Sequence, residues 1–219
     1  MKFSIILPTF NRAHLLSRAI DSVLKQTESS WELIIVDDGS TDTTHDLGTQ
    51  FTMHEGRIKY VFHSHRGLAL SRAAGIAAAS GEYVTFIDSD DEYAPDHLSQ
   101  RRAYLESHPD VDLLHGGVKI IGDPYVADKF DPTKKIHISN CVVGGTFVIR
   151  GSLIERIGGW PNVPYGDDNA FYEKALAAGR IIAMIESPTY IYYRGEEDSL
   201  CAIAEKSGIA GVVKFQTGS

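Results

Sequence analysis

The sequence predicts an α/β fold: a mostly parallel, doubly wound sheet with helices on both faces, followed by a smaller antiparallel sheet. First, apolar runs of strand length alternate with helical repeats through residues 1–105, and these runs lack the polar face of a half-exposed strand. Second, several runs end in clustered aspartates. Because ligands bind beyond the carboxyl ends of strands in such sheets, we expect one cleft to collect these carboxylates.

The elements of the first half follow from apolar spacing. A strand is expected at residues 3–7, ended by Pro8, and then a helix with Asn11 as its cap and apolar residues on one face. Gly67 opens an alanine-rich helix that Ser80-Gly81 closes. The other expected elements are strands at 32–36, 58–62 and 83–87 and helices at 41–51 and 95–107.

The second half is less regular. Long strands, hairpin-like and antiparallel, are expected at 111–121 and 141–149, with a polar loop at 122–139 between them. Short helices follow at 151–157 and 168–178, and short strands at 181–185 and 189–193. From Ser199 onward the periodicity fades. We therefore expect one domain over 1–200, with halves 1–105 and 106–200, and a mobile tail at 201–219.

Composition limits the class of protein. The chain has 219 residues, 43% of them hydrophobic and 23% charged, which suits one globular domain. A net charge of -8 argues against a nucleic-acid partner and against strong electrostatic binding to an anionic membrane. Two cysteines, Cys141 and Cys201, make no disulfide framework, and the apolar start is too short for a signal peptide. A cytoplasmic enzyme or binding protein fits best.

Among the clusters of aspartates, the one that follows the apolar run at 83–87 holds the most chemical information. Asp88, Asp90 and Asp91 follow the apolar run at 83–87, so three carboxylates lie within four positions. Each negative charge raises the pKa of its neighbours, and a shared divalent cation such as Mg²⁺ or Mn²⁺ relieves the repulsion. The alternative is a solvated turn with an aspartate as helix cap.

Several motifs occur in a fixed order. They are Pro8-Thr9-Phe10-Asn11-Arg12, Gln26-Thr27, the segment 32–42 ending in Asp37-Asp38-Gly39-Ser40-Thr41-Asp42, the segment 67–81 and the segment 86–91. In this order and spacing the chain closely resembles the family-2 glycosyltransferases, strongly over 1–105 and more loosely over 140–200. The resemblance implies the GT-A fold, with a nucleotide-sugar-binding half followed by an acceptor-binding half.

The resemblance also implies an activity. Family members usually transfer a sugar from a nucleotide diphosphate sugar to a hydroxyl acceptor with inversion, and they need a divalent metal, Mn²⁺ or Mg²⁺. UDP is the expected nucleotide, and the acceptor would be a carbohydrate or a lipid-linked sugar in surface polysaccharide or glycolipid assembly. A lipid-linked acceptor would require peripheral attachment of this cytoplasmic enzyme to the inner face of the membrane.

The donor site that the resemblance implies lies in the first half. Its expected residues are Pro8, Thr9, Asn11, Arg12, Asp37, Asp38, Arg72, Asp88, Ser89 and Asp90. Asp90 is expected to bind the metal and Asp88 the ribose or the water shell of the metal, with Asp91 behind them. For Asp37 and Asp38 the alternative is a turn and helix cap. For Arg72 the alternatives are a phosphate contact or an ion pair with Asp88.

The acceptor side is expected around the helix at 168–178. Asp168 falls at the position of the family's general base, and Asp167 replaces the usual glutamate before it. The alternative is an acidic N-cap pair favoured by the helix dipole. Gly145 and Trp160 resemble the acceptor-side segment, where Trp160 would stack on a sugar or pack in the core.

Three positions depart from the family pattern, and two rival functions remain. Ala73 follows Arg72 where an asparagine is common, no histidine follows Arg194, and His65 stands near a usual asparagine and could take over a nucleotide contact. A nucleotidyltransferase would carry a basic glycine-rich loop after the first strand, which this chain lacks. A non-catalytic nucleotide-sugar-binding protein would not need Asp168.

Overall fold

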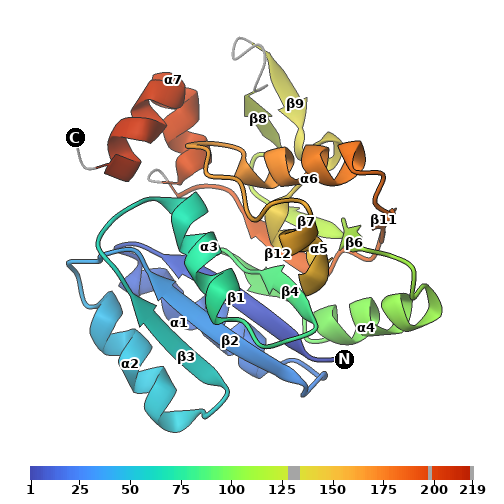
Figure 1. Cartoon of the computed structure of the whole chain (residues 1–219). Coiled ribbons are helices and arrows are strands. Elements are labelled where there is room, and N and C mark those ends of the chain that lie inside the picture. The colour runs from blue at the N-terminus through green and yellow to red at the C-terminus, as the bar shows by residue number, and fades with distance from the viewer. Residues whose placement is uncertain (128–133, 197–198, 218–219) are drawn as a thin grey trace.

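A computed structural model describes residues 1–127, 134–196 and 199–217 of the chain (Figure 1). Its centre is a seven-stranded sheet in the order β11-β6-β10-β4-β1-β2-β3. The first four strands in the sequence are all parallel to one another. They are β1 (Phe3–Thr9), β2 (Trp31–Asp37), β3 (Ile58–Phe62) and β4 (Tyr83–Phe86). The mostly parallel α/β sheet expected from the sequence is confirmed.

Helices cover both faces of this sheet. Every residue of β1 and β2 is buried, and successive side chains enter opposite cores, as the two-residue period of a strand requires. Ile5 packs with the apolar face of α1, whereas Ile6 packs toward α3, whose Gly75 lies close against it. These helices are α1 (Ala13–Leu24), α2 (Thr44–His54) and α3 (Leu68–Ala78).

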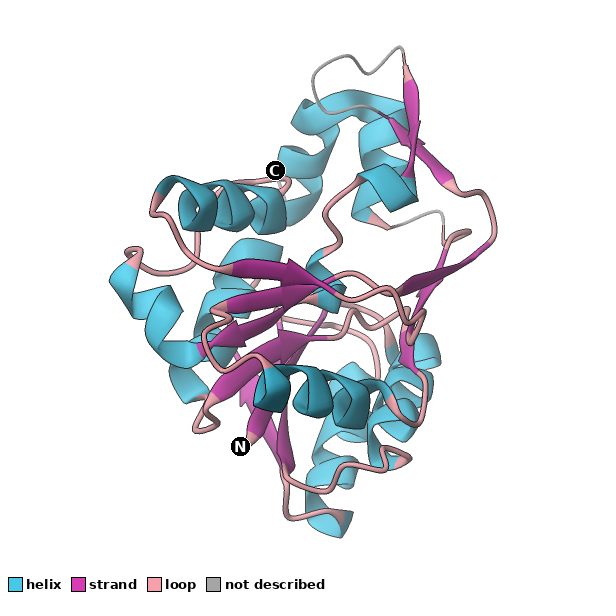
Figure 2. Cartoon of the chain, turned by 90° about the vertical axis from the view of Figure 1, so that its right-hand side faces the viewer, coloured by secondary structure: helices cyan, strands magenta, loops and turns pink. Residues whose placement is uncertain are grey.

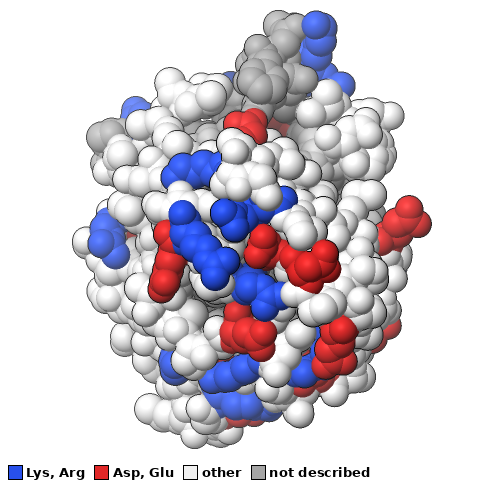
Figure 3. Space-filling view, turned by 45° about the vertical axis from the view of Figure 1, so that its right-hand side comes forward, with Lys and Arg blue, Asp and Glu red and all other residues white. Residues whose placement is uncertain are grey.

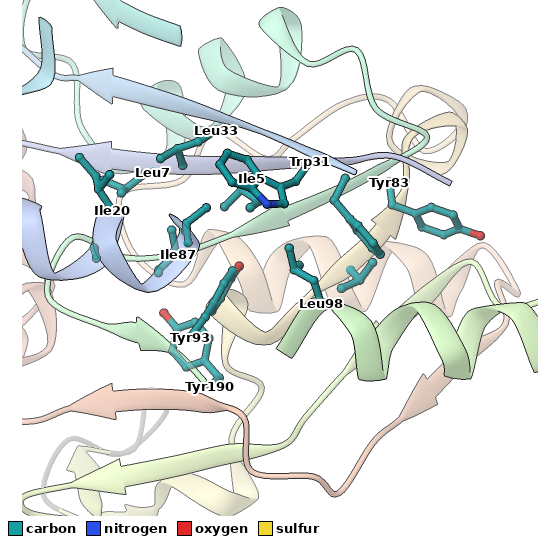
Figure 4. Packing of buried hydrophobic residues seen from close by; sticks show 14 of the residues in the cluster. Ile5, Leu7, Ile20, Trp31, Leu33, Tyr83, Ile87, Tyr93, Leu98 and Tyr190 are labelled. Carbon is teal, nitrogen blue, oxygen red and sulfur yellow. The ribbon is translucent and has the colours of Figure 1, made fainter. Parts of the chain in front are cut away.

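The larger of the two cores extends from the sheet to the second half of the chain. Figure 4 shows Ile5, Leu7 and Leu33 on the strands above Tyr93 and Tyr190. Leu98 joins them from α4 (His97–Ser107), the helix expected at 95–107. Burying a large apolar side chain contributes about 1.5–3 kcal/mol, so this cluster fixes the second half against the sheet.

The prediction of two long strands in the second half is wrong, because the strands observed there are shorter. Gly116 and Gly117, with φ of 92° and 74°, divide the segment 111–121 into β6 (Leu113–His115) and β7 (Val118–Ile121), which join different sheets. Only β10 (Val148–Arg150) is a strand within 141–150, and it is antiparallel to β4 and β6. Apolar runs of this length do not reveal a glycine break or a turn.

The remaining elements follow β4 in the sequence. The turns η1 (Ile138–Asn140) and η2 (Gly144–Thr146) precede β10. The helices are α5 (Gly151–Arg156) and α6 (Asp167–Ala177), and the strands are β5 (Glu92–Tyr93), β11 (Ile182–Met184) and β12 (Tyr190–Tyr193). A small sheet, β5-β12-β7, combines an antiparallel and a parallel pair. Figure 2 shows the layers from the side.

The segment expected as a polar loop at 122–139 contains an antiparallel pair. Its strands are β8 (Tyr125–Ala127) and β9 (Lys135–His137), and the aspartate-proline pair at 131–132 lies outside the described residues. The β8–β9 pair and the β5–β12 pair are the smaller antiparallel structure expected after the main sheet.

The segment where the sequence shows no clear period, from Ser199 onward, is helical in its described residues. Residues 200–217 form α7 (Leu200–Thr217), which is interrupted at Gly208, where φ is 65°. Val212 is fully buried and Gln216 nearly so. The helix packs beside β8, above the sheet in Figure 1. Two glycines and several alanines weaken the apolar period that would have revealed it.

Candidate active site

The carboxyl ends of β1, β2 and β4 open into a cavity of about 470 Å³. The start of α6, strand β12 and both ends of α7 complete its wall. Of the residues expected from the sequence, those that line it are Pro8, Thr9, Arg12, Asp38, Arg72, Asp88, Ser89, Asp90, Asp167 and Asp168. The structure therefore brings donor-side and acceptor-side residues to one cavity, and it leaves Asn11, Asp37, Gly145 and Trp160 outside the lining.

Asp37 and Asp38 have different surroundings. The Asp37 carboxylate is fully buried and accepts hydrogen bonds from the Ser40 amide at 2.8 Å and from the Tyr60 hydroxyl. It stabilises a turn, which favours the turn over ligand contact for Asp37. The Asp38 carboxylate accepts the amides of Arg66 and Gly67 at 2.7 and 2.8 Å. Asp38 therefore holds the loop before α3 at the edge of the cavity.

Asn11 does not cap α1. Its φ is 52°, and its side-chain oxygen accepts the Thr41 amide at 2.8 Å. The first amides of α1 instead donate to the Thr44 hydroxyl and to Asp42, at 3.1 and 3.2 Å. Side chains from the loop after β2 thus satisfy this helix end, which local sequence could not reveal.

Aromatic rings gather near Asp38. Phe10 stacks on His65 with ring centroids 4.0 Å apart, and Phe215 of α7 meets the Phe10 ring edge to face. His65 lies between the Asp38 carboxylate, 2.8 Å from Nδ1, and the Phe215 carbonyl, 3.0 Å from Nε2. His65 lines the cavity as its sequence position suggested, whereas Phe10 and Phe215 were missed. Flat rings at this place suit a nucleobase.

The Thr9 hydroxyl lies in the same region. Thr9 is 3% exposed and lines the cavity, and the described residues offer its hydroxyl no hydrogen-bond partner. A buried hydroxyl without a partner costs free energy unless a ligand supplies one. The orphaned group therefore fits a polar ligand bound at the end of β1.

The aspartates that follow β4 also differ from one another. Asp91 is fully buried and accepts the Tyr190 hydroxyl at 2.6 Å and the Tyr193 amide at 2.8 Å. It joins this loop to β12, directly behind the two aspartates that line the cavity. Asp88 and Asp90 line the cavity, with side chains 31% and 16% exposed.

Asp88 and Asp90 suit a divalent cation. Burial, and then the charge of Asp88, raise the pKa of Asp90 to about 6, which shows that negative charge is crowded here. The described residues contain no cluster of three or more metal-ligating side chains. Two carboxylates are nevertheless what Mg²⁺ or Mn²⁺ typically takes from a protein when substrate phosphates and waters supply the other ligands. The residues present therefore fit such a metal.

Arg12 and Arg72 are the cations of the cavity wall. Arg12 Nη1 lies 3.7 Å from Asp90 Oδ2. Arg72, 3% exposed, donates from Nη2 to Asp88 at 3.0 Å and from Nη1 to Asp167 at 2.9 Å. The ion pair with Asp88 was one of the two alternatives for Arg72, whereas the bond to Asp167 was not foreseen.

Asp167 and Asp168 begin α6. Asp167 is 4% exposed, and its second oxygen accepts the Trp160 indole N–H at 2.7 Å. Asp168 faces the cavity, where its oxygens accept the amides of Gly144 at 2.9 Å and Asn169 at 2.7 Å. Each of these oxygens retains a lone pair, so Asp168 can still accept a proton.

Asp168 has the acidity of a base that works near neutrality. Burial, and then the charge of Asp167, raise its pKa to about 6, although Arg72 and the two amides oppose the rise. A carboxylate tuned in this way is ionised at pH 7 and more basic than a free aspartate.

Trp160 and Gly145, expected on the acceptor side, both lie outside the lining of the cavity. Trp160 stacks on Phe171 with centroids 4.7 Å apart and packs against Phe86, at the edge of the core, where it holds Asp167. Of the two alternatives for Trp160, this geometry favours core packing. Gly145 is buried, and a Cβ there would overlap the Tyr190 hydroxyl. Its neighbour Gly144 approaches Asp168 so closely that a Cβ would lie 2.7 Å from the aspartate Cβ. These glycines permit close packing behind the cavity.

Structural comparison identifies the class of fold. TarS of S. aureus, solved with UDP-GlcNAc, superposes with a TM-score of 0.74 and 22% identity over 99% of this chain and 67% of TarS. The mannosyltransferase PcManGT of Pyrobaculum calidifontis, solved with GDP-Man and Mn²⁺, gives a TM-score of 0.75 at 19% identity, over 100% of this chain and 64% of PcManGT. The fold is GT-A, the fold of nucleotide-sugar-dependent glycosyltransferases.

The sequence match then gives the family. The model for glycosyl transferase family 2 matches residues 4–157, and the chain belongs to this family of enzymes. The Escherichia coli UDP-Glc:α-D-GlcNAc-diphosphoundecaprenol β-1,3-glucosyltransferase WfgD is 32% identical over 151 residues, which are 67% of this chain and 58% of WfgD. The chain thus spans little more than half the length of this relative. Within the described residues, no helix has the length and hydropathy needed to cross a membrane.

Proposed function

We propose that this chain transfers a sugar from a nucleotide diphosphate sugar, with UDP as the expected nucleotide, to a hydroxyl acceptor with inversion. The observation that supports this most is the meeting of Asp88, Asp90 and Asp168 in one cavity. Two of these carboxylates suit a metal and the third has the surroundings of a base. A nucleotide-binding module without activity would not need the third.

The donor would lie along the strand ends. The Phe10–His65 pair offers a stacking surface for the base, and Thr9 offers a hydroxyl for the nucleoside. Asp88 and Asp90 would hold Mn²⁺ or Mg²⁺ against the diphosphate. A cation bound there would neutralise the diphosphate as it leaves, which is Lewis-acid chemistry.

Asp168 would act as the general base. The acceptor oxygen attacks the anomeric carbon while the bond from that carbon to the diphosphate oxygen breaks, and Asp168 takes the proton of the acceptor hydroxyl. The amides of Gly144 and Asn169 hold the carboxylate in place without protonating it. A base placed in this way typically contributes 10²–10⁴-fold, that is, about 3–5 kcal/mol.

The acceptor is proposed to be a lipid-linked sugar, in surface polysaccharide or glycolipid assembly. WfgD, by its name, acts on such an acceptor, a GlcNAc-diphosphoundecaprenol. Apolar side chains of Val126, Ile136 and Ile138 line the cavity on the side of the β8–β9 pair, which suits an acceptor with apolar parts. We propose that the enzyme works at the cytoplasmic face of a membrane through peripheral attachment.

A thermal-shift screen of nucleotide sugars with and without Mn²⁺ tests the donor. A ligand that binds only the native state at a hundred times its Kd stabilises it by about 2.7 kcal/mol. We expect the largest shift with a UDP-sugar in the presence of Mn²⁺. Equal shifts with adenosine, guanosine and uridine compounds would contradict the proposed donor.

Replacing Asp168 tests the reaction. Asp168→Asn should retain UDP and Mn²⁺ binding and lose roughly 10²–10⁴-fold in the rate of transfer. Asp46→Asn is the matched control, because Asp46 also lies in the first turn of a helix, α2, but outside the cavity. Full activity of Asp168→Asn would refute the assignment of the base.

A further inference from the structure

Arg72 joins the donor side of the cavity to the acceptor side. It projects from α3, and its two terminal nitrogens donate to Asp88 and Asp167, at 3.0 and 2.9 Å. Asp88 belongs to the loop after β4, and Asp167 begins α6, 95 positions from Arg72 in the sequence. One guanidinium therefore connects the proposed metal carboxylate with the carboxylate next to the proposed base.

The surroundings of Arg72 leave it little freedom. Its side chain is 4% exposed, and the guanidinium lies 5.3 Å from the centre of the Phe86 ring. Asp167, 5% exposed in its side chain, has its other oxygen bound by Trp160, whose ring stacks on Phe171. An arginine that two carboxylates and an aromatic ring hold in this way has one fixed orientation and is not a mobile cation.

We propose that Arg72 is a positioning residue that aligns Asp88 and Asp167, the carboxylate next to the proposed base, and that it does not bind the donor diphosphate. The inference rests on the proposed function of the same cavity. Each terminal nitrogen already donates to a carboxylate, and Nε is buried where no ligand reaches it. A phosphate in the place of either carboxylate would therefore break the buried pair with Asp167 or the part-buried pair with Asp88. Breaking such a pair leaves an uncompensated charge and is costly.

The charges around Asp168 decide in which direction its pKa should change when Arg72 or Asp167 is replaced. Among the described residues, four ionisable groups interact with it: Asp167 in the same helix, Arg72 from α3, Tyr165 from the preceding loop and Cys201 from α7. The charge of Asp167 raises the pKa of Asp168, and that of Arg72 lowers it. Removing the arginine should therefore leave the base protonated to higher pH, and removing the Asp167 charge should do the opposite.

The test measures how kcat/KM falls at low pH, the acid limb of its pH profile. The reaction is followed as UDP release, at saturating Mn²⁺, from the donor that stabilises the protein most. We expect Arg72→Gln to move this limb upward by about one pH unit and Asp167→Asn to move it downward by a similar amount. Arg72→Lys keeps the positive charge, so its acid limb should lie close to that of the wild type. Its kcat should stay below the wild-type value, because lysine lacks the two terminal nitrogens that bind two carboxylates at once.

Two further measurements separate positioning from ligand binding. A ¹³C NMR titration of labelled aspartate carboxyls, with the Asp168 signal assigned through Asp168→Asn, should show the same upward shift in Arg72→Gln without any substrate. UDP affinity measured with a chelator present should be unchanged in Arg72→Gln. A phosphate ligand would instead lose roughly tenfold or more in UDP affinity.

Arg101→Lys is the matched control for loss of a buried guanidinium. Arg101 lies in α4, fully buried, and donates to the Thr189 hydroxyl at 2.8 Å and the Gly116 carbonyl at 2.9 Å, outside the cavity. It should lower the melting temperature and leave the acid limb in place. An unmoved limb in an active, folded Arg72→Gln variant, or weaker metal-free UDP binding, would overturn the inference. Lack of transfer by the wild-type chain with every donor would instead refute the proposed function.

Discussion

The donor and acceptor sides of the cavity are built in different ways. The donor side stands on the ends of β1, β2 and β4, whose positions are fixed by a continuous parallel hydrogen-bond ladder. The acceptor side stands on helix starts and loops, and single side-chain contacts hold it in place, such as Trp160 to Asp167 and Tyr190 to Asp91. Backbone ladders tolerate a changed side chain, whereas a loop that depends on one side chain does not.

The two sides nevertheless share one arrangement of adjacent aspartates. Three pairs occur, 37–38, 90–91 and 167–168. In the first two pairs only Asp38 and Asp90 line the cavity, whereas both aspartates of the third pair line it. Asp37, Asp91 and Asp167 hold their loops through buried contacts, and Asp90 and Asp168 are available for chemistry. Substitutions on the donor side should therefore alter binding, and those on the acceptor side should also alter stability.

The largest effect is expected for Asp90→Asn on the donor side. The substitution removes one of two proposed metal carboxylates, and we expect a loss of activity of at least roughly 10²-fold with little change in the melting temperature of the metal-free protein. Calorimetric titration with Mn²⁺ and UDP checks it. Asp110→Asn, on the exposed turn after α4, is the control. Unchanged Mn²⁺ binding by Asp90→Asn would remove the metal assignment.

Next in size is the pH dependence set by the acceptor side. The base works only when ionised, and the pKa of Asp168 is raised to about 6, so kcat/KM should fall about tenfold per pH unit below pH 6 and level off above pH 7. Because Asp90 also has a raised pKa, the profile is measured at saturating Mn²⁺, which displaces protons from metal ligands. If the fall of kcat/KM at low pH shifts with the Mn²⁺ concentration, it reports the protonation of Asp90 and not that of Asp168.

Gly145→Ala tests how tightly the acceptor side is packed. The added methyl would overlap the hydroxyl of Tyr190, which is fully buried and bound to Asp91. Overpacking of this kind typically costs 1–3 kcal/mol, to be measured by denaturant unfolding. Gly56→Ala is the control, because nothing lies within 4 Å of a Cβ there. Equal stability of the two variants would show that Tyr190 moves without cost.

Trp160→Phe should have the smallest effect and decides between core packing and sugar stacking. The phenylalanine keeps a ring on Phe171 but loses the N–H that binds Asp167, so we expect a loss of about 1 kcal/mol in the free energy of unfolding. The KM for the acceptor should be unchanged. A raised acceptor KM with unchanged stability would restore the sugar-stacking interpretation.

Sequence reasoning did well where structure is local and periodic. Each strand of the parallel half lies within a few residues of its expected position, because a fully apolar run between turn residues has few other solutions in a soluble domain. The second half was harder, since its strands are only three or four residues long and α7 has no clear period. The Gly116-Gly117 turn places β7 in the small sheet instead of the main one, and no apolar pattern encodes that turn.

The candidate site divides in the same way. By itself the sequence determined the family and the clusters of carboxylates at strand ends, because motif order and apolar period are written along the chain. Only the tertiary structure decided that Asp38 and Asp90 line the cavity while Asp37 and Asp91 do not, that Trp160 packs against the core and that Arg72 binds Asp167. The physical reason is that a side chain points where partners distant in the sequence satisfy it, and Arg72 and Asp167 meet only after the two halves have packed together.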